Sequence, residues 1–281
     1  MKIISQINDL LNYKNTINSK SIGLVPTMGA LHDGHLSLID SSYKICDITI
    51  VTIFVNPMQF SINEDLNNYP SSIDNDIELL NKLDVDVLFM PTKSTMYPKG
   101  FSTYVGEKEI SLINEGMSRP IFFQGVLTIV SKLFNIVQPT HAFFGQKDAQ
   151  QLFVVRKLVE DMNYNINIID CPTIRCYNGL AMSSRNKYFT NIQAEEANIV
   201  YSSLCKAVDL IKSGELSSDT IKQEIEHCLV HPSLSIDYIS IVDKKSFTEI
   251  RQIKGDIILL IAVVFYKVRL IDNIYYSCSS T

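Results

Sequence analysis

The chain has 281 residues, 46% hydrophobic and 20% charged, which is enough to bury a sizeable core as one large domain or two modest ones. Its 25 basic and 30 acidic side chains give a net charge of −5, which argues against nucleic-acid binding but permits a small phosphorylated substrate. The longest apolar run, residues 257–265, has about nine residues, less than half of the ~20 that a membrane-spanning helix needs.

The N-terminus and the cysteines indicate a cytoplasmic protein. Asn8 and Asp9 come before any apolar signal-peptide core can form. The 6 cysteines are dispersed in a chain of this size, which favours free thiols over a disulfide framework. His227, Cys228 and His231 lie close in sequence, but they do not complete a ligand set at structural-zinc spacing, so we expect no such metal site.

The first 175 or so residues alternate strand-like and helix-like stretches. Ser71 and Ser72 are suited to cap a helix that runs to about residue 83, and Asp74 and Asp76 would favour its positive end. The other expected helices cover residues 36–45, 126–137 and 149–162, and the expected strands cover residues 21–25, 47–55, 85–90, 141–144 and 166–170. This alternation predicts an α/β fold, with a mostly parallel sheet and helices on both faces.

From about residue 176 the pattern changes. Two helical stretches, 191–213 and 218–229, precede strand-like runs at residues 235–242, 256–265 and 267–271. Helices followed by strands suggest a separate, smaller α+β unit. We therefore expect an α/β domain over residues 1–175 and a smaller domain over residues 176–281.

The strongest local pattern is Pro-Thr-Met-Gly-Ala-Leu-His-Asp-Gly-His at residues 26–35. It follows an expected strand and opens a helix, the position where open α/β sheets bind ligands and where unpaired N–H groups attract phosphate. Gly29 and Gly34 let the backbone approach a ligand closely. His32 and His35 share one helix face, where an imidazolium can stabilise charge that develops on a phosphate. The simpler alternative is a glycine-containing turn with two exposed histidines.

A second candidate segment, Phe-Val-Asn-Pro-Met-Gln-Phe at residues 54–60, follows the next strand. Gln59 carries both donors and an acceptor, so it can bind a hydroxyl or carboxylate of a small substrate. Asn-Pro by itself is mostly a turn signal.

Two more segments carry phosphate-suited groups. In Phe-Gly-Gln-Lys-Asp at residues 144–148, Lys147 can hold phosphate and Asp148 can cap the helix that carries Gln151. The loop Met-Ser-Ser-Arg-Asn at residues 182–186 can clamp a leaving pyrophosphate. The joint occurrence of these segments points to an ATP-using α/β enzyme with a small second domain.

At these residues the sequence resembles the pantothenate synthetase (pantoate–β-alanine ligase) family over roughly residues 20–190. The matching segments, in family order and spacing, are residues 26–35, 54–60, 63–65, 69–70, 96–98, 132–137, 145–148 and 180–186. The resemblance implies a Rossmann-like, cytidylyltransferase-related nucleotide-binding domain, a smaller C-terminal lid domain and a homodimer.

The implied reaction, which belongs to pantothenate and coenzyme A biosynthesis, has two steps. The carboxylate of (R)-pantoate attacks the α-phosphorus of ATP and gives pantoyl-adenylate and pyrophosphate. The amine of β-alanine then attacks the acyl carbon and releases pantothenate and AMP. ATP is a co-substrate with Mg²⁺ carried on its phosphates, and positioning with charge stabilisation can carry the rate.

The resemblance also implies roles for individual residues. His35 would be the catalytic acid, with His32 beside it on the phosphates. Gln59 would bind pantoate and later β-alanine, and Gln151 would bind pantoate. The ATP site would comprise Met28, Gly29, Ala30, Leu31, His32, Asp33, Gly34, His35, Gly145, Gln146, Lys147, Asp148, Ile174, Met182, Ser183, Ser184 and Arg185.

Three positions depart from the family pattern. Phe122 stands where a histidine is customary, and Gln146 stands where a glutamate is customary. Ser71 replaces an arginine that often follows Tyr-Pro. Because both motif histidines, Lys147 and Arg185 are present, we expect an active enzyme.

Three alternatives remain. A nucleotidylyltransferase would use the same His-x-Gly-His chemistry, but residues 54–60 and 182–186 argue against it. A relative of the aminoacyl-tRNA synthetases would need a basic tRNA-binding domain, which this acidic chain does not offer. Phe122 raises the third alternative, a catalytically inactive nucleotide-binding protein.

Overall fold

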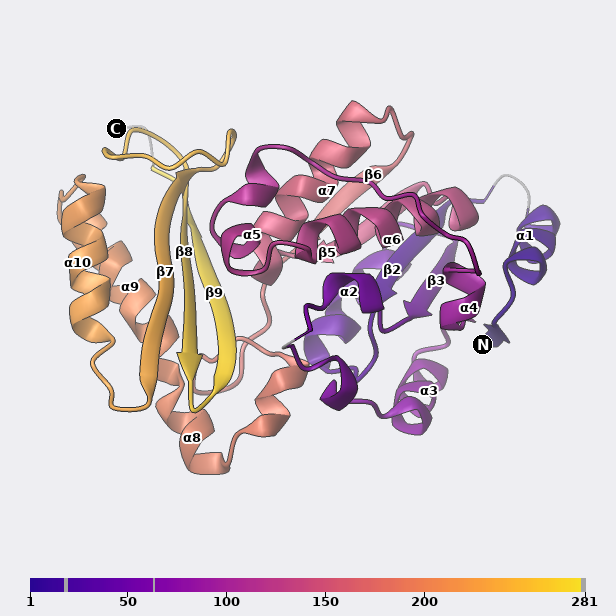
Figure 1. Ribbon diagram of the computed structural model, residues 1–281, viewed down its shortest axis with the longest axis horizontal. Helices are drawn as coiled ribbons and strands as arrows, with labels where there is room; N and C mark the ends of the chain where they lie inside the picture. The colour runs from indigo at the N-terminus through magenta and orange to yellow at the C-terminus, as the bar shows by residue number, and fades with distance from the viewer. Residues whose placement is uncertain (18–19, 63, 279–281) are drawn as a thin grey trace. The chain divides into compact units, whose positions relative to one another are not determined.

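The structure, a computed structural model, describes residues 1–17, 20–62 and 64–278 (Figure 1). The chain forms two compact units. Unit 1 contains Met1–Gln146 and Gln150–Thr173, and unit 2 contains Lys147–Ala149 and the chain from Ile174 onward. The short segment Lys147–Ala149 belongs to unit 2, although the residues before and after it belong to unit 1.

Unit 1 is built on a parallel sheet (Figure 1). In the described residues its strands are β1 (Lys2–Ile4), β2 (Ile22–Thr27), β3 (Ile48–Ile53), β4 (Val87–Phe89), β5 (His141–Gly145) and β6 (Asn167–Cys171). Their order across the sheet is β1-β4-β3-β2-β5-β6. The chain runs outward from β2 through β3 to β4 and then returns to place β5 on the other side of β2. The switch point of the sheet therefore lies between β2 and β5, where open α/β sheets bind ligands beyond the strands' carboxyl ends.

Helices cover both faces of this sheet because alternate strand residues point to opposite sides. Leu24 and Ile50 pack in one core with α1 (Ile7–Thr16), α6 (Phe122–Val137) and α7 (Ala149–Asp161). Val25 and Val51 pack in a second core with α2 (Asp33–Tyr43) and α3 (Ile73–Lys82). The predicted α/β class with a parallel sheet is confirmed. Short helices in the connections are η1 (Pro57–Gln59), η2 (Leu66–Asn68), α4 (Lys93–Met96), η3 (Ile110–Leu112), α5 (Glu115–Ser118) and η4 (Gln146–Asp148).

Unit 2 contains an antiparallel sheet of β7 (Leu234–Asp243), β8 (Ile257–Phe265) and β9 (Val268–Tyr276), in that order. The apolar residues at alternate positions of β8 pack with α9 (Asn198–Lys212) and α10 (Ser218–Cys228) in a core of their own. The chain enters this core through η5 (Ser184–Tyr188) and α8 (Asn191–Glu196). Helices followed by strands therefore form the α+β unit that the sequence predicts.

Several elements differ from their predicted bounds. The sequence pattern did not identify β1, which is only 3 residues long, or α1. Helix α6 begins at Phe122 rather than at residue 126. The helix expected over residues 191–213 is broken at Ala197, where the Val200 N–H bonds the Ala197 carbonyl in a tighter turn. Strand β9 extends to Tyr276 because it pairs with β8 along its whole length.

Two remaining features concern cysteines and membranes. All 6 cysteines are free thiols, as their dispersal predicts. Among the described residues, none of the helices is both long enough and apolar enough to cross a bilayer.

Candidate active site

The backbone after β2 turns through the left-handed region. Gly29 has φ +84° and Ala30 has φ +51°, which is a strained value for a residue with a side chain. The Thr27 hydroxyl donates to the Thr52 carbonyl at 2.7 Å and accepts the Gly29 N–H at 3.2 Å. A Cβ at Gly29 would lie 3.1 Å from both Ile53 Cγ2 and Asp76 Oδ2, so glycine suits this position in space as well as in conformation.

Asp76, in the first turn of α3, stabilises the turn after β2 through hydrogen bonds. Its carboxylate accepts the N–H groups of Ala30 and Leu31 at 2.7 and 2.9 Å. Ser72 is the N-cap residue of α3 and Asp76 lies in its first turn, as predicted. The expected side-chain cap by Ser72 is wrong, because its hydroxyl donates to Asp76 Oδ1 at 3.1 Å instead. Sequence reasoning placed Asp76 in a helix but did not identify it as part of the site.

His32 and His35 lie together at the start of α2. His32 is the N-cap residue, and its Nδ1 accepts the Gly34 N–H at 3.2 Å, which places a neutral ring's proton on Nε2. The ring centroids of His32 and His35 are 4.1 Å apart, as their spacing in the sequence predicts. This pair presents imidazole nitrogens beside a helix N-terminus, a combination suited to phosphate.

Gln59 lies in η1, which follows β3, and its side chain contacts the loop after β2 that carries Met28. Its Nε2 donates to Met28 Sδ at 3.1 Å, so the first two predicted segments meet in space. Its Oε1 accepts from Asn56 Nδ2 at 3.0 Å. Asn56 Oδ1 in turn accepts the Tyr97 hydroxyl at 2.7 Å, and burial raises the pKa of Tyr97, which keeps that hydroxyl a donor. Asn56 and Tyr97 thus fix the orientation of the Gln59 amide, a contribution that the sequence pattern did not assign to them.

Arg119 supports the backbone of Gln59 from the other side. Its Nη2 bonds Glu64 Oε2 at 2.5 Å and the Gln59 carbonyl at 3.3 Å, and its Nη1 lies 3.3 Å from Glu115 Oε1. Its guanidinium carbon lies 3.9 Å from the centre of the Phe122 ring. Phe122, one of the departures from the family pattern, therefore packs against a largely buried cation.

The third predicted segment ends β5. Gln146 Nε2 donates to Asp170 Oδ2 at 3.0 Å, and Asp170 Oδ1 also pairs with Arg156 at 2.7 Å. A glutamate at position 146 would bring a second carboxylate against Asp170, so the amide found here fits its neighbour. Gly145 and Gln146 belong to unit 1.

Other predicted residues lie in unit 2 or on α7. Lys147 and Asp148 belong to unit 2, where the Lys147 carbonyl accepts Asn273 Nδ2 at 2.8 Å. The Met182 N–H bonds the Ile174 carbonyl at 2.9 Å, which brings these two predicted residues together. Within the same unit, Ser183 caps η5 by accepting the Arg185 N–H, and Ser184 is buried.

Gln151 lies half-buried in the first turn of α7. The residue before it, Gln150, is buried and donates to the carbonyls of Ile110 and Ile113 at 2.6 and 2.9 Å. These bonds fix the start of α7 and hence the backbone that carries Gln151. Within the part of the chain that the structure describes, no hydrogen bond joins Gln151 to Gln59, so their common role in binding pantoate stays a prediction.

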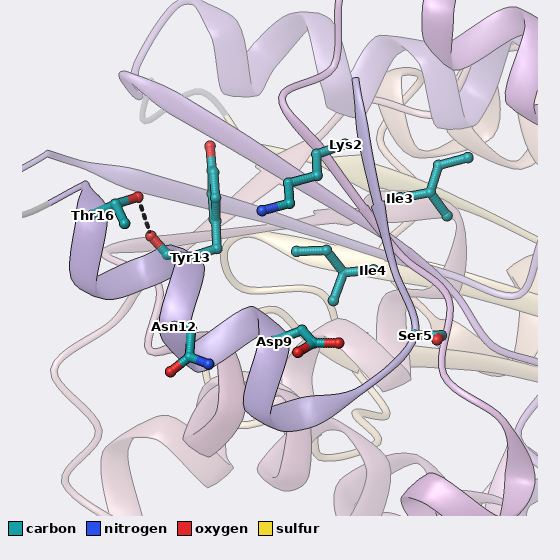
Figure 2. A pocket seen from close by; sticks show the side chains of 8 residues that line it. All are labelled: Lys2, Ile3, Ile4, Ser5, Asp9, Asn12, Tyr13 and Thr16. Carbon is teal, nitrogen blue, oxygen red and sulfur yellow. Dashed lines mark hydrogen bonds between the residues drawn. The ribbon is translucent and has the colours of Figure 1, made fainter.

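A surface pocket of about 400 Å³ lies elsewhere, beside the edge strand β1 (Figure 2). It is lined by Lys2, Ile3, Ile4, Ser5, Asp9, Asn12, Tyr13 and Thr16. Figure 2 shows the Lys2 side chain beside the Tyr13 ring, and its ammonium lies 5.1 Å from the ring centre. None of the predicted site residues lines this pocket, so it is separate from the histidine loop.

Comparison with known proteins identifies the family. The model of the pantoate-β-alanine ligase family matches residues 2–275. The pantothenate synthetase of Thermosipho africanus is 48% identical over 275 residues, which cover 97% of this chain and 99% of the relative. That of Fervidobacterium nodosum is 47% identical over 280 residues, with coverage of 99% and 100%.

Solved structures agree. The crystal structure of pantothenate synthetase from Thermus thermophilus is similar with a TM-score of 0.93 at 36% identity, over 98% of this chain and 99% of that chain. The ligase from Francisella tularensis, solved in complex with βγ-ATP and β-alanine, is similar with a TM-score of 0.79 at 38% identity, with coverage of 98% and 97%. The chain belongs to the pantoate–β-alanine ligase family and is an ATP-dependent ligase of pantothenate biosynthesis.

Proposed function

We propose that this chain condenses pantoate with β-alanine through a pantoyl-adenylate, with His32 and His35 acting on the phosphates of ATP. The observation that carries the proposal is the pair of imidazole rings, 4.1 Å apart, at the first turn of α2. This turn follows β2 beside the switch point of the sheet, the position that suits a nucleotide. The complex of the Francisella tularensis relative with βγ-ATP and β-alanine supports these substrates.

In the first step a pantoate carboxylate oxygen attacks the α-phosphorus of ATP, and the bond to the bridging oxygen of pyrophosphate breaks. Negative charge develops on the phosphate oxygens as this bond breaks. His35 as an imidazolium donates to that charge and acts as the acid, with His32 beside it. The other proposed ATP contacts are residues 28–34, residues 145–148, Ile174 and residues 182–185.

In the second step the amine of β-alanine attacks the acyl carbon, loses a proton, and AMP leaves with the bonding electrons. Gln59 holds pantoate and then β-alanine, since its amide is fixed by Asn56 and Met28. Gln151 holds pantoate. Because an acyl-adenylate hydrolyses readily, we propose that residues 176–281 form a lid domain which excludes water from the ATP and pantoate domain of residues 1–175.

Three accompanying properties belong to the same proposal. Mg²⁺ arrives on the ATP phosphates as part of the substrate, in keeping with its preference for phosphate oxygens. The protein acts as a homodimer, which the family resemblance supports. It acts in the cytoplasm, which its 6 free cysteines support.

The first test is pantoate-dependent exchange of labelled pyrophosphate into ATP, with magnesium and without β-alanine. We expect exchange that requires D-pantoate, which is (R)-pantoate. Without β-alanine only the adenylation half-reaction takes place, and its reversal carries labelled pyrophosphate into ATP. Replacement of His35 by Ala is expected to lower the exchange rate about 100-fold, the contribution of a positioned acid.

His141→Ala is the matched control. His141 is the first residue of β5, at the opposite end of that strand from Gly145. The exchange rate of the His141→Ala variant should therefore equal that of the parent. If the folded parent protein binds ATP but shows no exchange, it is an inactive binding protein or uses another acceptor. Full exchange by His35→Ala would refute the role of His35.

A further inference from the structure

We propose that Asp76 is a positioning residue for adenylation, because its carboxylate holds the left-handed turn that sets His32 and His35 at the start of α2. The inference rests on the proposed function of the two histidines. Asp76 itself belongs to α3, 41 residues beyond His35, and its carboxylate bonds the backbone of the turn and the Ser72 hydroxyl.

The carboxylate of Asp76 is completely buried, with 0% exposure. Oδ2 accepts the Ala30 N–H at 2.7 Å, and Oδ1 accepts both the Leu31 N–H at 2.9 Å and the Ser72 hydroxyl at 3.1 Å. A buried carboxylate needs such donors to offset its lost hydration. Two of the three come from the backbone of one turn, so the charge is satisfied only when that turn has this shape.

The backbone conformation of this turn is strained and needs stabilising contacts from another element. Ala30, at φ +51°, occupies a region that residues with side chains disfavour, and it directly follows Gly29 at φ +84°. Hydrogen bonds to a charged acceptor are stronger than those to a neutral one. The two bonds from Ala30 and Leu31 therefore offset the strain of the turn, and they fix two successive peptide units just before His32.

The location of the charge favours a geometric role over an electrostatic one. A negative side chain buried beside a phosphate-binding loop opposes the charge of ATP, so direct attraction cannot explain its place there. His32 follows Leu31 and caps α2, and His35 lies in the first turn. A rotation of the peptide units at Ala30 and Leu31 would displace both imidazoles from a developing charge that only short distances can stabilise.

The test is Asp76→Asn, which keeps the size of the side chain but turns one acceptor into an NH₂ group facing an N–H donor. We expect kcat and the pantoate-dependent exchange rate to fall at least tenfold. The KM for pantoate should change less than kcat, since Asn56 and Arg119 also hold Gln59 and only its contact with Met28 Sδ adjoins this turn. A purely structural residue would lower the folded fraction and leave the kcat per folded molecule unchanged.

Asp74→Asn is the matched control, because Asp74 lies in the same first turn of α3 but is exposed. It makes the same change in charge near the helix end and should leave kcat unchanged. A second variant, Ser72→Ala, removes only the 3.1 Å bond to Asp76 and should lower kcat by a smaller factor, about threefold. It keeps the proposal testable if Asp76→Asn does not fold.

The outcomes separate this inference from the proposed function. Pantoate-dependent exchange is first measured in the parent, and its absence there would refute the proposed function. If the parent exchanges and Asp76→Asn has the kcat of Asp74→Asn, the positioning role of Asp76 is refuted while the function stands. If Asp76→Asn does not fold and Ser72→Ala has the same kcat as the parent, the positioning role of Asp76 is also refuted.

Discussion

Phe122 shows how a single aromatic ring supports the site from outside it. The guanidinium of Arg119 is nearly buried, with 12% of its side chain exposed, and it forms ion pairs with Glu64 and Glu115. The Phe122 ring covers its face at 3.9 Å. A ring beside a desolvated cation contributes about 1–2 kcal/mol. Because Arg119 also donates to the Gln59 carbonyl, the ring indirectly fixes the backbone of Gln59.

Phe122→Leu should therefore raise the KM for pantoate by about fivefold, since ~1 kcal/mol of support for Arg119 is lost. The KM for ATP should change less than the KM for pantoate, because the contacts of Arg119 lead to Gln59, which adjoins the histidine loop through its hydrogen bond to Met28. Steady-state kinetics with each substrate varied in turn measures both values.

Phe123→Leu is the control, because Phe123 is buried in the same helix but Arg119 stacks on Phe122. It should lower stability by about 1 kcal/mol and leave the KM for pantoate unchanged. If both substitutions raise the KM for pantoate equally, packing of α6 and not the contact between Arg119 and Phe122 determines that KM.

Residues close in sequence were predictable, and those joined only in space were not. The spacing of His32 and His35 already places them on one helix face. Asp76 and Ala30 are 46 positions apart, and Arg119 and Gln59 are 60 apart, so no local pattern connects them. The same limit applies to Gln146, whose amide donates to Asp170 on the neighbouring strand.

At the scale of elements, the close approach of α6 to η1 shapes the pantoate end of the proposed site. A Cβ on Gly125 of α6 would lie 2.4 Å from the Met58 carbonyl oxygen and 2.5 Å from the Gln59 nitrogen. The Gly125 carbonyl also accepts Asn56 Nδ2 at 3.0 Å. Glycine thus allows a helix to dock directly on the backbone of the segment that carries Gln59.

Gly125→Ala tests this contact. In an open helix position the change stabilises by up to about 1 kcal/mol, but here the clash should outweigh that gain and destabilise the protein by about 2 kcal/mol. The displaced Gln59 should also raise the KM for pantoate. Denaturant unfolding and steady-state kinetics measure the two effects.

Gly255→Ala is the matched control, because nothing lies within 4 Å of the Cβ it would add. Its effect on stability should stay within about 0.5 kcal/mol. A Gly125→Ala protein as stable as the parent would contradict the proposed role of the contact.

This docking also explains where element prediction failed. Alternating apolar runs were enough to predict the parallel sheet, because buried strands carry their own pattern. The start of α6 was placed too late, at residue 126, because the glycine at 125 lowers helix propensity while its packing on η1 is a tertiary effect. The 3-residue strand β1 was missed since its formation depends on pairing with β4.

At the scale of the whole molecule, the chain passes between the units at 146/147, 149/150 and 173/174. The change of sequence pattern near residue 175 suggests the last of these positions. The first two could not be predicted, because Lys147 belongs to unit 2 through a partner 126 residues away, Asn273 on β9. The sequence therefore did not predict that a strand near the C-terminus holds the backbone of a proposed phosphate-binding lysine.

The side chain of Asn273 holds the backbone of Lys147. Asn273 is buried, and its Nδ2 donates to the Lys147 carbonyl at 2.8 Å while Arg175 and Asp272 bond its own backbone. Asn273→Ala leaves the carbonyl without this donor, a loss of about 1–3 kcal/mol, and we expect the KM for ATP to rise about tenfold with the KM for pantoate unchanged. Ser203→Ala is the control, because it removes a buried bond of the same kind, from the Ser203 hydroxyl to the Val200 carbonyl at 2.7 Å, away from Lys147. It should lower stability alone. A rise in the KM for ATP in both variants would mean that general loosening of unit 2, and not the position of Lys147, governs ATP binding.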